Sequence, residues 1–222
     1  MCNRVIETIQ CICPTCITNL PRTEEALLRE NLTEEPFLHI RNFGVGASFL
    51  FFEKDAPVQT LLHRMKYGRF AEPHIGYELA QLAAKEFMEY GFFDDIDVIV
   101  PVPLHRKRLK ERGFNQAEWI AKGLSDSTHI PMDTTHLLRI RNNAHQAQEQ
   151  GRDRKKNVEH LFDVNHPEEW YRLHILLVDD IITTGSTLLS CIDALSPVRD
   201  AQFSVFAIGK SRTNNSHINV EQ

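Results

Sequence analysis

ILLVDDIITTGST, residues 175–187, is an apolar run that ends in two adjacent carboxylates and is followed by a hydroxyl-rich loop around one glycine. The apolar run predicts a buried strand over His174–Asp179, and the residues after the loop predict a helix over Ser186–Leu195. A loop that opens a helix offers backbone N–H groups and a positive helix end to an anion. The stretch therefore predicts an anion site at the end of a strand.

The residue types of this loop indicate which anion is bound. A glycine allows close approach of the backbone, and hydroxyls donate to phosphate oxygens. Carboxylates repel a phosphate but accept hydrogen bonds from a vicinal diol such as that of ribose. The predicted ligand is a ribose 5-phosphate, with the diol on Asp179 and Asp180 and the phosphate on Thr183, Thr184, Gly185, Ser186 and Thr187. The alternative is a helix after a buried strand whose hydroxyls serve only as caps, whereas a P-loop is excluded because the loop has no Lys.

Other segments alternate between strand and helix patterns. The sequence DVIVPVP from Asp97 is typical of a buried strand stopped by prolines. Such alternation favours right-handed crossovers and a mainly parallel α/β sheet. Further predicted strands cover 48–52, 134–138, 161–164 and 202–208, and predicted helices cover 24–31, 58–66, 75–90 and a segment from about Phe114 that follows a basic loop.

Length and composition are those of one medium α/β domain with a small appendage, since the chain has 222 residues, of which 42% are hydrophobic and 25% charged. No run approaches the ~18 apolar residues of a membrane span, and the start lacks a signal-peptide pattern. We therefore expect a cytoplasmic protein without membrane insertion. The net charge is −5, but residues 101–160 hold twelve Lys or Arg against seven Asp or Glu. This basic part suits a phosphorylated small molecule or a limited nucleic-acid footprint, although a solvated face without a ligand is an equally ordinary explanation.

The quoted stretch resembles the phosphoribosylpyrophosphate (PRPP) signature of type I phosphoribosyltransferases. The resemblance implies that Asp179 and Asp180 bind the ribose hydroxyls, that residues 183–187 wrap the 5-phosphate, and that Mg²⁺ accompanies PRPP. It also implies a type I phosphoribosyltransferase fold over residues 23–222.

Three more segments resemble a narrower group, the ComF family of competence-associated proteins and their GntX-like relatives. They are VPVPLHRKRLKERGFNQAEWIA (100–121), RIRNNAHQAQEQGRDRKKNVEHLF (139–162) and LLHRMKYG (61–68). The first implies a pyrophosphate loop of Pro103, Leu104, His105, Arg106 and Arg108, and the second a hood whose Arg141 and Gln146 reach the substrate. The hood departs from the family pattern, because Asn143 stands where Thr is usual and Glu149 where Leu is expected.

The amino-terminal residues 1–22 are rich in cysteine. Cys13-Pro-Thr-Cys16 has the C-x2-C spacing that grips zinc in a tight turn, and metal binding is commoner than a disulfide in the cytoplasm. We expect a zinc-ribbon-like segment with Cys2, Cys11, Cys13 and Cys16 as candidate Zn²⁺ ligands. A truncated or degenerate site of reduced thiols is the alternative. Cys191, in the predicted helix after the loop, is expected in the core.

Three functions fit these features. The first is an enzyme that transfers phosphoribose from PRPP to a nitrogen nucleophile. The second, implied by the ComF resemblance, is an accessory factor that binds PRPP and single-stranded DNA beside the DNA-uptake machinery of natural transformation, with basic segments 106–112 and 152–156 on the phosphates. The third is a PRPP-sensing regulator. The acceptor pocket and the oligomeric state have no readable signature.

Overall fold

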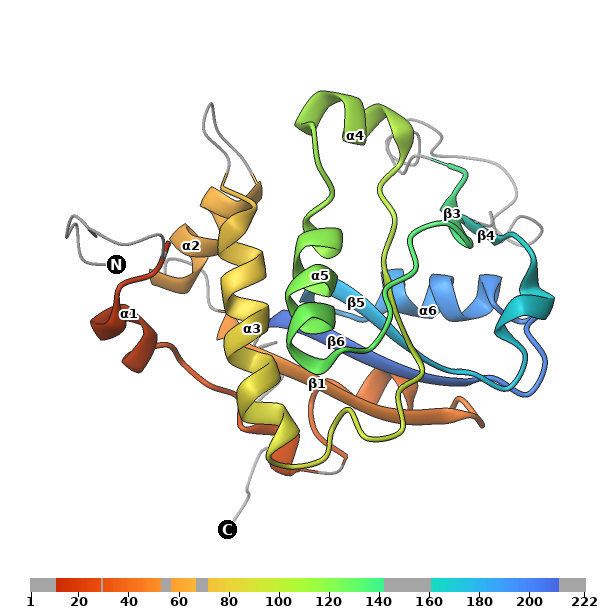
Figure 1. Ribbon diagram of the computed structural model, residues 1–222, viewed down its shortest axis with the longest axis horizontal. Helices are drawn as coiled ribbons and strands as arrows, with labels where there is room; N and C mark the ends of the chain where they lie inside the picture. The colour runs from red at the N-terminus through yellow and green to blue at the C-terminus, as the bar shows by residue number, and fades with distance from the viewer. Residues whose placement is uncertain (1–10, 29, 53–56, 67–71, 142–160, 212–222) are drawn as a thin grey trace, which may run out of the picture.

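The computed structural model describes residues 11–28, 30–52, 57–66, 72–141 and 161–211, and a four-stranded sheet forms its centre. The strand order is β1 (Phe43–Phe52), β6 (Gln202–Ser211), β5 (His174–Ile182) and β2 (Val98–Pro101). All three pairings are parallel. The predicted fold class, a mainly parallel sheet flanked by helices, is confirmed (Figure 1).

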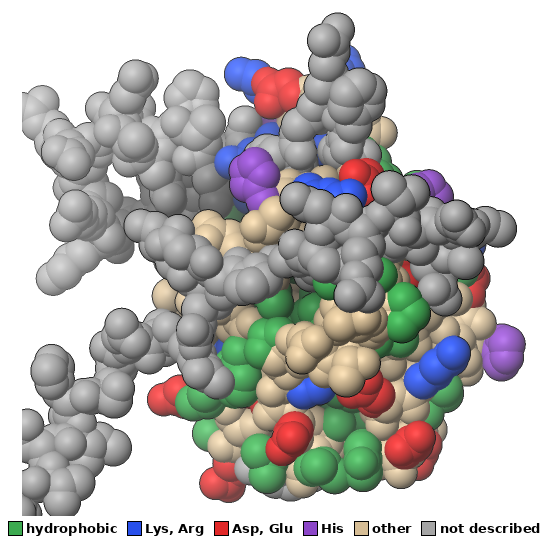
Figure 2. Space-filling model, turned by 90° about the vertical axis from the view of Figure 1, so that its left-hand side faces the viewer, with side chains coloured by type: hydrophobic (Ala, Val, Ile, Leu, Met, Phe, Trp, Pro, Cys, Tyr) green, Lys and Arg blue, Asp and Glu red, His purple; other side chains and the backbone are tan. Residues whose placement is uncertain are grey.

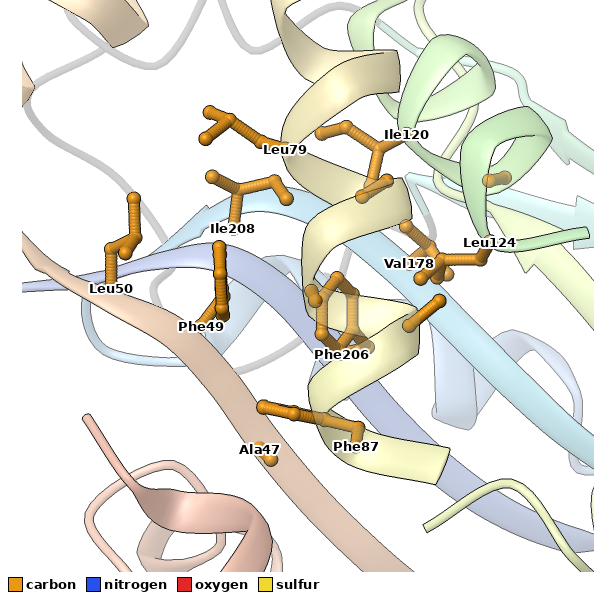
Figure 3. Packing of buried hydrophobic residues seen from close by; sticks show 14 of the residues in the cluster. Ala47, Phe49, Leu50, Leu79, Phe87, Ile120, Leu124, Val178, Phe206 and Ile208 are labelled. Atoms are coloured by element: carbon orange, nitrogen blue, oxygen red, sulfur yellow. The ribbon is translucent and has the colours of Figure 1, made fainter. Parts of the chain in front are cut away.

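Helices cover both faces of this sheet. α2 (Pro57–Lys66), α3 (His74–Met88) and α5 (Gln116–Thr128) contribute to one hydrophobic cluster, and α6 (Ser186–Ala194) contributes to another. Figure 3 shows the first cluster, in which Phe87 of α3 and Leu124 of α5 lie over Val178 and Phe206 of the sheet. Because both faces are covered, the central strands can be apolar at nearly every position.

Side-chain alternation in β5 explains the apolar run of the quoted stretch. Ile175 and Leu177 belong to the cluster with α6, whereas Leu176 and Val178 belong to the cluster with α3 and α5. Successive side chains of a strand point to opposite faces, so a strand with two covered faces has no polar alternation. Cys191 of α6 is fully buried in the second cluster, as predicted for a core residue, and burial raises the pKa of its thiol.

Smaller elements complete the described chain. α1 (Pro14–Thr18) precedes one-turn 3-10 helices at Glu25–Leu27 and Glu35–Phe37, and another lies at Pro167–Trp170. β3 (Leu137–Arg139) and β4 (Phe162–Val164) form a two-stranded antiparallel sheet. Among the residues described, no helix combines the length and the apolar character that a membrane crossing requires.

Two predicted elements are wrong in type or extent. The basic loop after β2 is the helix α4 (Arg106–Arg112), which begins at the cap His105 and ends at Gly113 with φ +85°. The predicted helix 24–31 is reduced to the single turn Glu25–Leu27, because buried side-chain hydrogen bonds take the place of helical ones there.

Several strands are longer than predicted. β1 begins at Phe43 instead of 48, and β5 continues to Ile182, so that the two aspartates lie inside the strand. The reason is the neighbouring strand: β6 runs to Ser211, and its residues pair with β5 as far as Ile182. Polar side chains do not interrupt the backbone hydrogen bonds between strands. Backbone pairing therefore determines where these strands end.

Candidate functional site

Two adjoining cavities lie at the carboxyl ends of β2 and β5. This is where ligands bind in parallel α/β sheets. The larger, about 230 Å³ in volume, faces β2, and the smaller, about 20 Å³, is formed by the hydroxyl-rich loop. Asp179, Ile181 and Thr187 line both cavities. Of the acidic pair, Asp179 therefore lies where the two cavities adjoin.

The two aspartates are held by the sheet. Asp179 pairs with Ala207 of β6, and the backbone N–H of Asp180 donates to Asp179 Oδ1 at 2.8 Å. Both side chains are half-buried, and Asp180 lines the larger cavity only. Strand residues have a fixed backbone, so the two carboxylates are presented in a fixed arrangement.

The loop of residues 183–187 is shaped for close approach. Gly185 has φ +76° and caps α6 without a side chain, while the N–H of Ser186 donates to Thr184 Oγ1 at 3.4 Å. Thr184 Oγ1 also donates to Ser186 Oγ at 3.2 Å, so that local hydrogen bonds engage two of the loop hydroxyls. The exposed loop side chains are those of Thr183, Thr184 and Ser186. Capping alone does not explain this number of hydroxyls.

Lys210 supports this loop from β6 and was not identified from the sequence. Its side chain is buried, pairs in register with Ile182, and donates from Nζ to the carbonyl oxygen of Thr183 at 3.3 Å. Burial lowers the pKa of Lys210, and the negative charges of Glu25 and Glu35 act in the opposite direction. A buried cation therefore lies next to the first carbonyl of the loop.

The larger cavity has a basic wall. Arg108 and Arg112 come from α4 and Arg139 from β3, and all three line the cavity together with the two aspartates. Burial, and then the charge of Arg108, lowers the pKa of Arg139, but an arginine remains charged in proteins. Leu104, Asn115 and Gln116 also line this cavity.

Four of these lining residues were missed by sequence reasoning: Arg112, Asn115, Gln116 and Arg139. Three of them belong to the segment 100–121 that carries the family resemblance, and Arg139 begins the segment 139–162. Membership of these two segments was the available signal. It could not show which side chains face the cavity.

Other predicted site residues lie elsewhere. Pro103, His105 and Arg106 follow β2 but do not line either cavity. His105 instead caps α4, where its Nδ1 accepts from the N–H of Lys107 at 3.3 Å, and Arg106 is exposed. Arg141 is exposed beside β4, and Gln146 lies outside the described residues.

Three of the described cysteines, Cys11, Cys13 and Cys16, lie at or near the start of α1. Cys13 is buried and caps the helix, with its Sγ accepting from the N–H of Cys16 at 3.4 Å, and Cys11 donates its N–H to Glu78. An N–H directed at the first sulfur of a C-x2-C turn is compatible with a metal-binding turn. Burial, followed by the charge of Glu78, raises the pKa of the Cys11 thiol, which favours its protonated form.

Among the residues that the structure describes, no group of three or more His, Cys, Asp or Glu side chains is arranged to hold a metal ion. Cys2, the fourth candidate ligand, lies outside them. Zinc binding therefore stays a prediction.

Comparison with curated proteins identifies relatives of this chain. DNA utilization protein YhgH of Escherichia coli (strain K12) is 30% identical over 191 residues, which cover 85% of this chain and 79% of that protein. Competence protein F of Haemophilus influenzae is 29% identical over 158 residues, 70% of this chain and 69% of that protein. The chain belongs to the ComF family. Competence protein ComFC of Bacillus subtilis is 40% identical to this ComF-family protein over 92 residues, 41% of this chain and 35% of the relative.

No family model matches the sequence of this ComF-family protein. Among solved structures, a glutamine PRPP amidotransferase from B. subtilis in complex with ADP and GMP has a TM-score of 0.45 at 16% identity. The match covers 67% of this chain and 30% of that one. An allosteric regulatory enzyme of purine biosynthesis has a TM-score of 0.41 at 15% identity, with 65% and 30% of the two chains covered.

Proposed function

We propose that this ComF-family protein binds PRPP with Mg²⁺ at the two adjoining cavities and transfers its phosphoribosyl group to a nitrogen nucleophile. The observation that carries the proposal is the position of Asp179 and Asp180. Asp179 lines both a small cavity formed by the loop hydroxyls and a larger cavity lined by arginines, and Asp180 beside it lines the larger one. PRPP has the same order of groups: a phosphate, a ribose diol and a pyrophosphate.

In this proposal the ribose defines the centre of the site. The carboxylates of Asp179 and Asp180 accept hydrogen bonds from the ribose 2- and 3-hydroxyls, and such charge-assisted bonds are stronger than neutral ones. The 5-phosphate takes the small cavity, where Gly185 allows close approach and the start of α6 adds a positive helix end. The loop hydroxyls of Thr183, Thr184, Ser186 and Thr187 complete its donors.

The pyrophosphate takes the larger cavity, where Arg108, Arg112 and Arg139 offset its charge. During transfer the bond between the anomeric carbon and the pyrophosphate oxygen breaks, and its electron pair leaves with pyrophosphate. A bond from the nitrogen nucleophile to the same carbon replaces it, and the nitrogen loses a proton. Cationic side chains fixed where negative charge develops favour such a departure.

Mg²⁺ fits the donor set of this site. Protein sites for Mg²⁺ use one or two carboxylates together with substrate phosphates and retained waters. Asp179 and Asp180 would supply the carboxylates, and PRPP would supply phosphate oxygens. The ion would neutralise charge on the pyrophosphate.

The first test is a calorimetric titration of the protein with PRPP, with and without Mg²⁺. The Asp179→Asn, Asp180→Asn double variant should lose affinity by several kcal/mol at most, since a hydrogen bond to a charged group is worth ~1.5–3 kcal/mol. The matched control is Asp94→Asn, Asp95→Asn, an adjacent exposed pair before β2 at the opposite end of the sheet. An unchanged affinity of the first variant would defeat the ribose assignment, and release of pyrophosphate from PRPP in the presence of amines would support transfer.

A second candidate function is an accessory role on single-stranded DNA. The observation in its favour is α4, where Arg106, Lys107, Arg108 and Lys110 are exposed on one short helix. Figure 2 shows several Lys and Arg side chains at the upper end of the face of the molecule that is turned to the viewer, and Figure 1 places α4 at this upper end. The names of the relatives, a DNA utilization protein and competence proteins, are compatible with this role.

Binding and turnover assays separate the candidates. Oligonucleotide binding that falls steeply with added salt, without pyrophosphate release, would favour the accessory role. Binding of PRPP without turnover and without DNA binding would favour a PRPP-sensing regulator.

A further inference from the structure

Gln116 is a buried polar side chain that the mechanism above does not use. It is the first residue of α5, is only 1% exposed, and its Nε2 has no hydrogen-bond partner among the described residues. Buried side-chain donors in folded proteins are nearly always paired, and an exception calls for an explanation. Because Gln116 lines the larger cavity, a ligand in that cavity can supply the missing acceptor.

The backbone around Gln116 is firmly placed. The preceding Asn115 donates from Nδ2 to the carbonyl oxygen of Val102 at 3.0 Å, and its Oδ1 accepts from the N–H of Ala117 at 3.2 Å. These bonds join the start of α5 to the end of β2. The backbone that carries Gln116 is thus fixed at the cavity before any ligand arrives, and burial restricts the side chain, which lowers the cost of binding.

The surroundings indicate what the amide meets. An N–H donor needs an acceptor such as an oxygen, and the cavity also holds Arg108, Arg112 and Arg139. This wall suits an anion with several oxygens. The two carboxylates that also line the cavity disfavour an anion close to them, so we place its oxygens near the arginines and the start of α5.

We infer that Gln116 is a binding residue for the pyrophosphate group of PRPP, donating from Nε2 to one of its oxygens; this inference rests on the proposed function. The neutral amide of Gln116 would add one directional hydrogen bond to the pyrophosphate beside the charges of the three arginines. A diphosphate on the anomeric carbon has an oxygen for this donor, whereas ribose 5-phosphate lacks the group altogether.

The test uses the full chain and two variants. Gln116→Met keeps the size of the side chain but removes the donor, and Gln116→Glu replaces the amide by a carboxylate that repels an anion. The probes are PRPP, inorganic pyrophosphate and ribose 5-phosphate, titrated by calorimetry with Mg²⁺. Gln202→Met is the control, because Gln202 is exposed and lies at the opposite end of the sheet, at the start of β6.

We expect Gln116→Met to weaken PRPP and pyrophosphate about tenfold, or ~1.4 kcal/mol, and Gln116→Glu to weaken them further. Affinity for ribose 5-phosphate should not change in Gln116→Met. The ligand-free Gln116→Met protein should be as stable as the wild type or more so, because an unpaired buried donor is removed; a merely structural Gln116 would give the opposite result.

The outcomes distinguish the two proposals. If the wild type binds PRPP and both variants bind it equally well, this inference fails and the proposed function stands. A parallel loss for all three probes with a destabilised ligand-free protein also overturns the inference. If the wild type binds neither PRPP nor pyrophosphate, the proposed function fails first and this inference fails with it.

Discussion

Replacing Gly185 by alanine tests whether the loop is shaped by its backbone and by the segment beneath it. Gly185 has φ +76°, and a Cβ there would lie 3.1 Å from Phe37 Cζ and 3.1 Å from Pro36 Cβ. A left-handed conformation costs a non-glycine residue ~1–2 kcal/mol. Crowding in a packed interior adds ~1–3 kcal/mol. We therefore expect Gly185→Ala to lower the free energy of unfolding by about 2–5 kcal/mol in urea denaturation.

Gly113→Ala provides a matched control for this prediction. Gly113 also has a left-handed φ of +85°, but no atom of the part of the chain that the structure describes lies within 4 Å of a Cβ built on it. Its substitution should therefore cost only the backbone term, ~1–2 kcal/mol. Equal losses of stability in the two variants would refute the argument, because they would show that Phe37 and Pro36 do not confine the loop. If the loop binds the 5-phosphate, Gly185→Ala should also weaken PRPP binding, whereas Gly113→Ala should weaken it less.

Two further predictions concern the amino-terminal part of the chain. Burial raises the pKa of Glu25 above its ordinary value of 4.5, so the folded state binds this proton more tightly than the unfolded state does. The resulting contribution to stability is lost as the pH rises from 4.5 through the folded pKa. When unfolding is measured at several pH values, the stability of the wild type minus that of Glu25→Gln should fall over that window, and a rise would contradict the assignment. Replacing Cys13 and Cys16 by Ser should lower the zinc content measured by elemental analysis, and a wild type that holds no zinc under reducing conditions would end the metal hypothesis.

The sequence was most informative where one segment carries both structure and chemistry. The run from Ile175 to Thr187 predicted a buried strand, a loop and a following helix, and the structure has all three, while anion binding by the loop stays a prediction. It predicted the strand too short, because backbone pairing with β6 carries β5 past the two aspartates. Polar residues mark a strand end only where the neighbouring strand also ends.

The basic helix α4 escaped prediction for a different reason. RKRLKER has a single apolar residue, Leu109, and so lacks the periodicity that indicates an amphipathic helix. Gly113 directly after it was the signal that could have been used, since glycine in a left-handed conformation commonly ends helices. Without α4, the direction of Arg108 and Arg112 toward the cavity could not be foreseen.

The larger cavity could not be derived from the sequence, because it depends on strand order. β2 lies next to β5 in the sheet, although more than seventy residues separate Pro101 from its partner Val178. That pairing brings Gln116 and Arg112 to the acidic pair. Sequence motifs named the segments, and only the topology shows which of their side chains share a space.

The segment of residues 25–37, for which the sequence predicted little structure, packs against the loop of residues 183–187 and against β1. Glu25 is buried and accepts hydrogen bonds from Thr33 and from the N–H of Ser48 in β1, which fixes the segment to the edge of the sheet. Farther along the chain, Phe37 lies close to Gly185. Lys210 donates a hydrogen bond to the carbonyl oxygen of Thr183, and the negative charge of Glu25 favours the charged form of Lys210.

These contacts give the loop a floor of buried groups that belong to neither β5 nor α6. A phosphate site needs donors held in place before the ligand arrives. We therefore expect residues that never touch a ligand to influence its affinity. Substitution of Glu25 should act on the loop through Lys210, because Glu25 is the carboxylate whose charge most favours the charged form of Lys210, followed by Glu35.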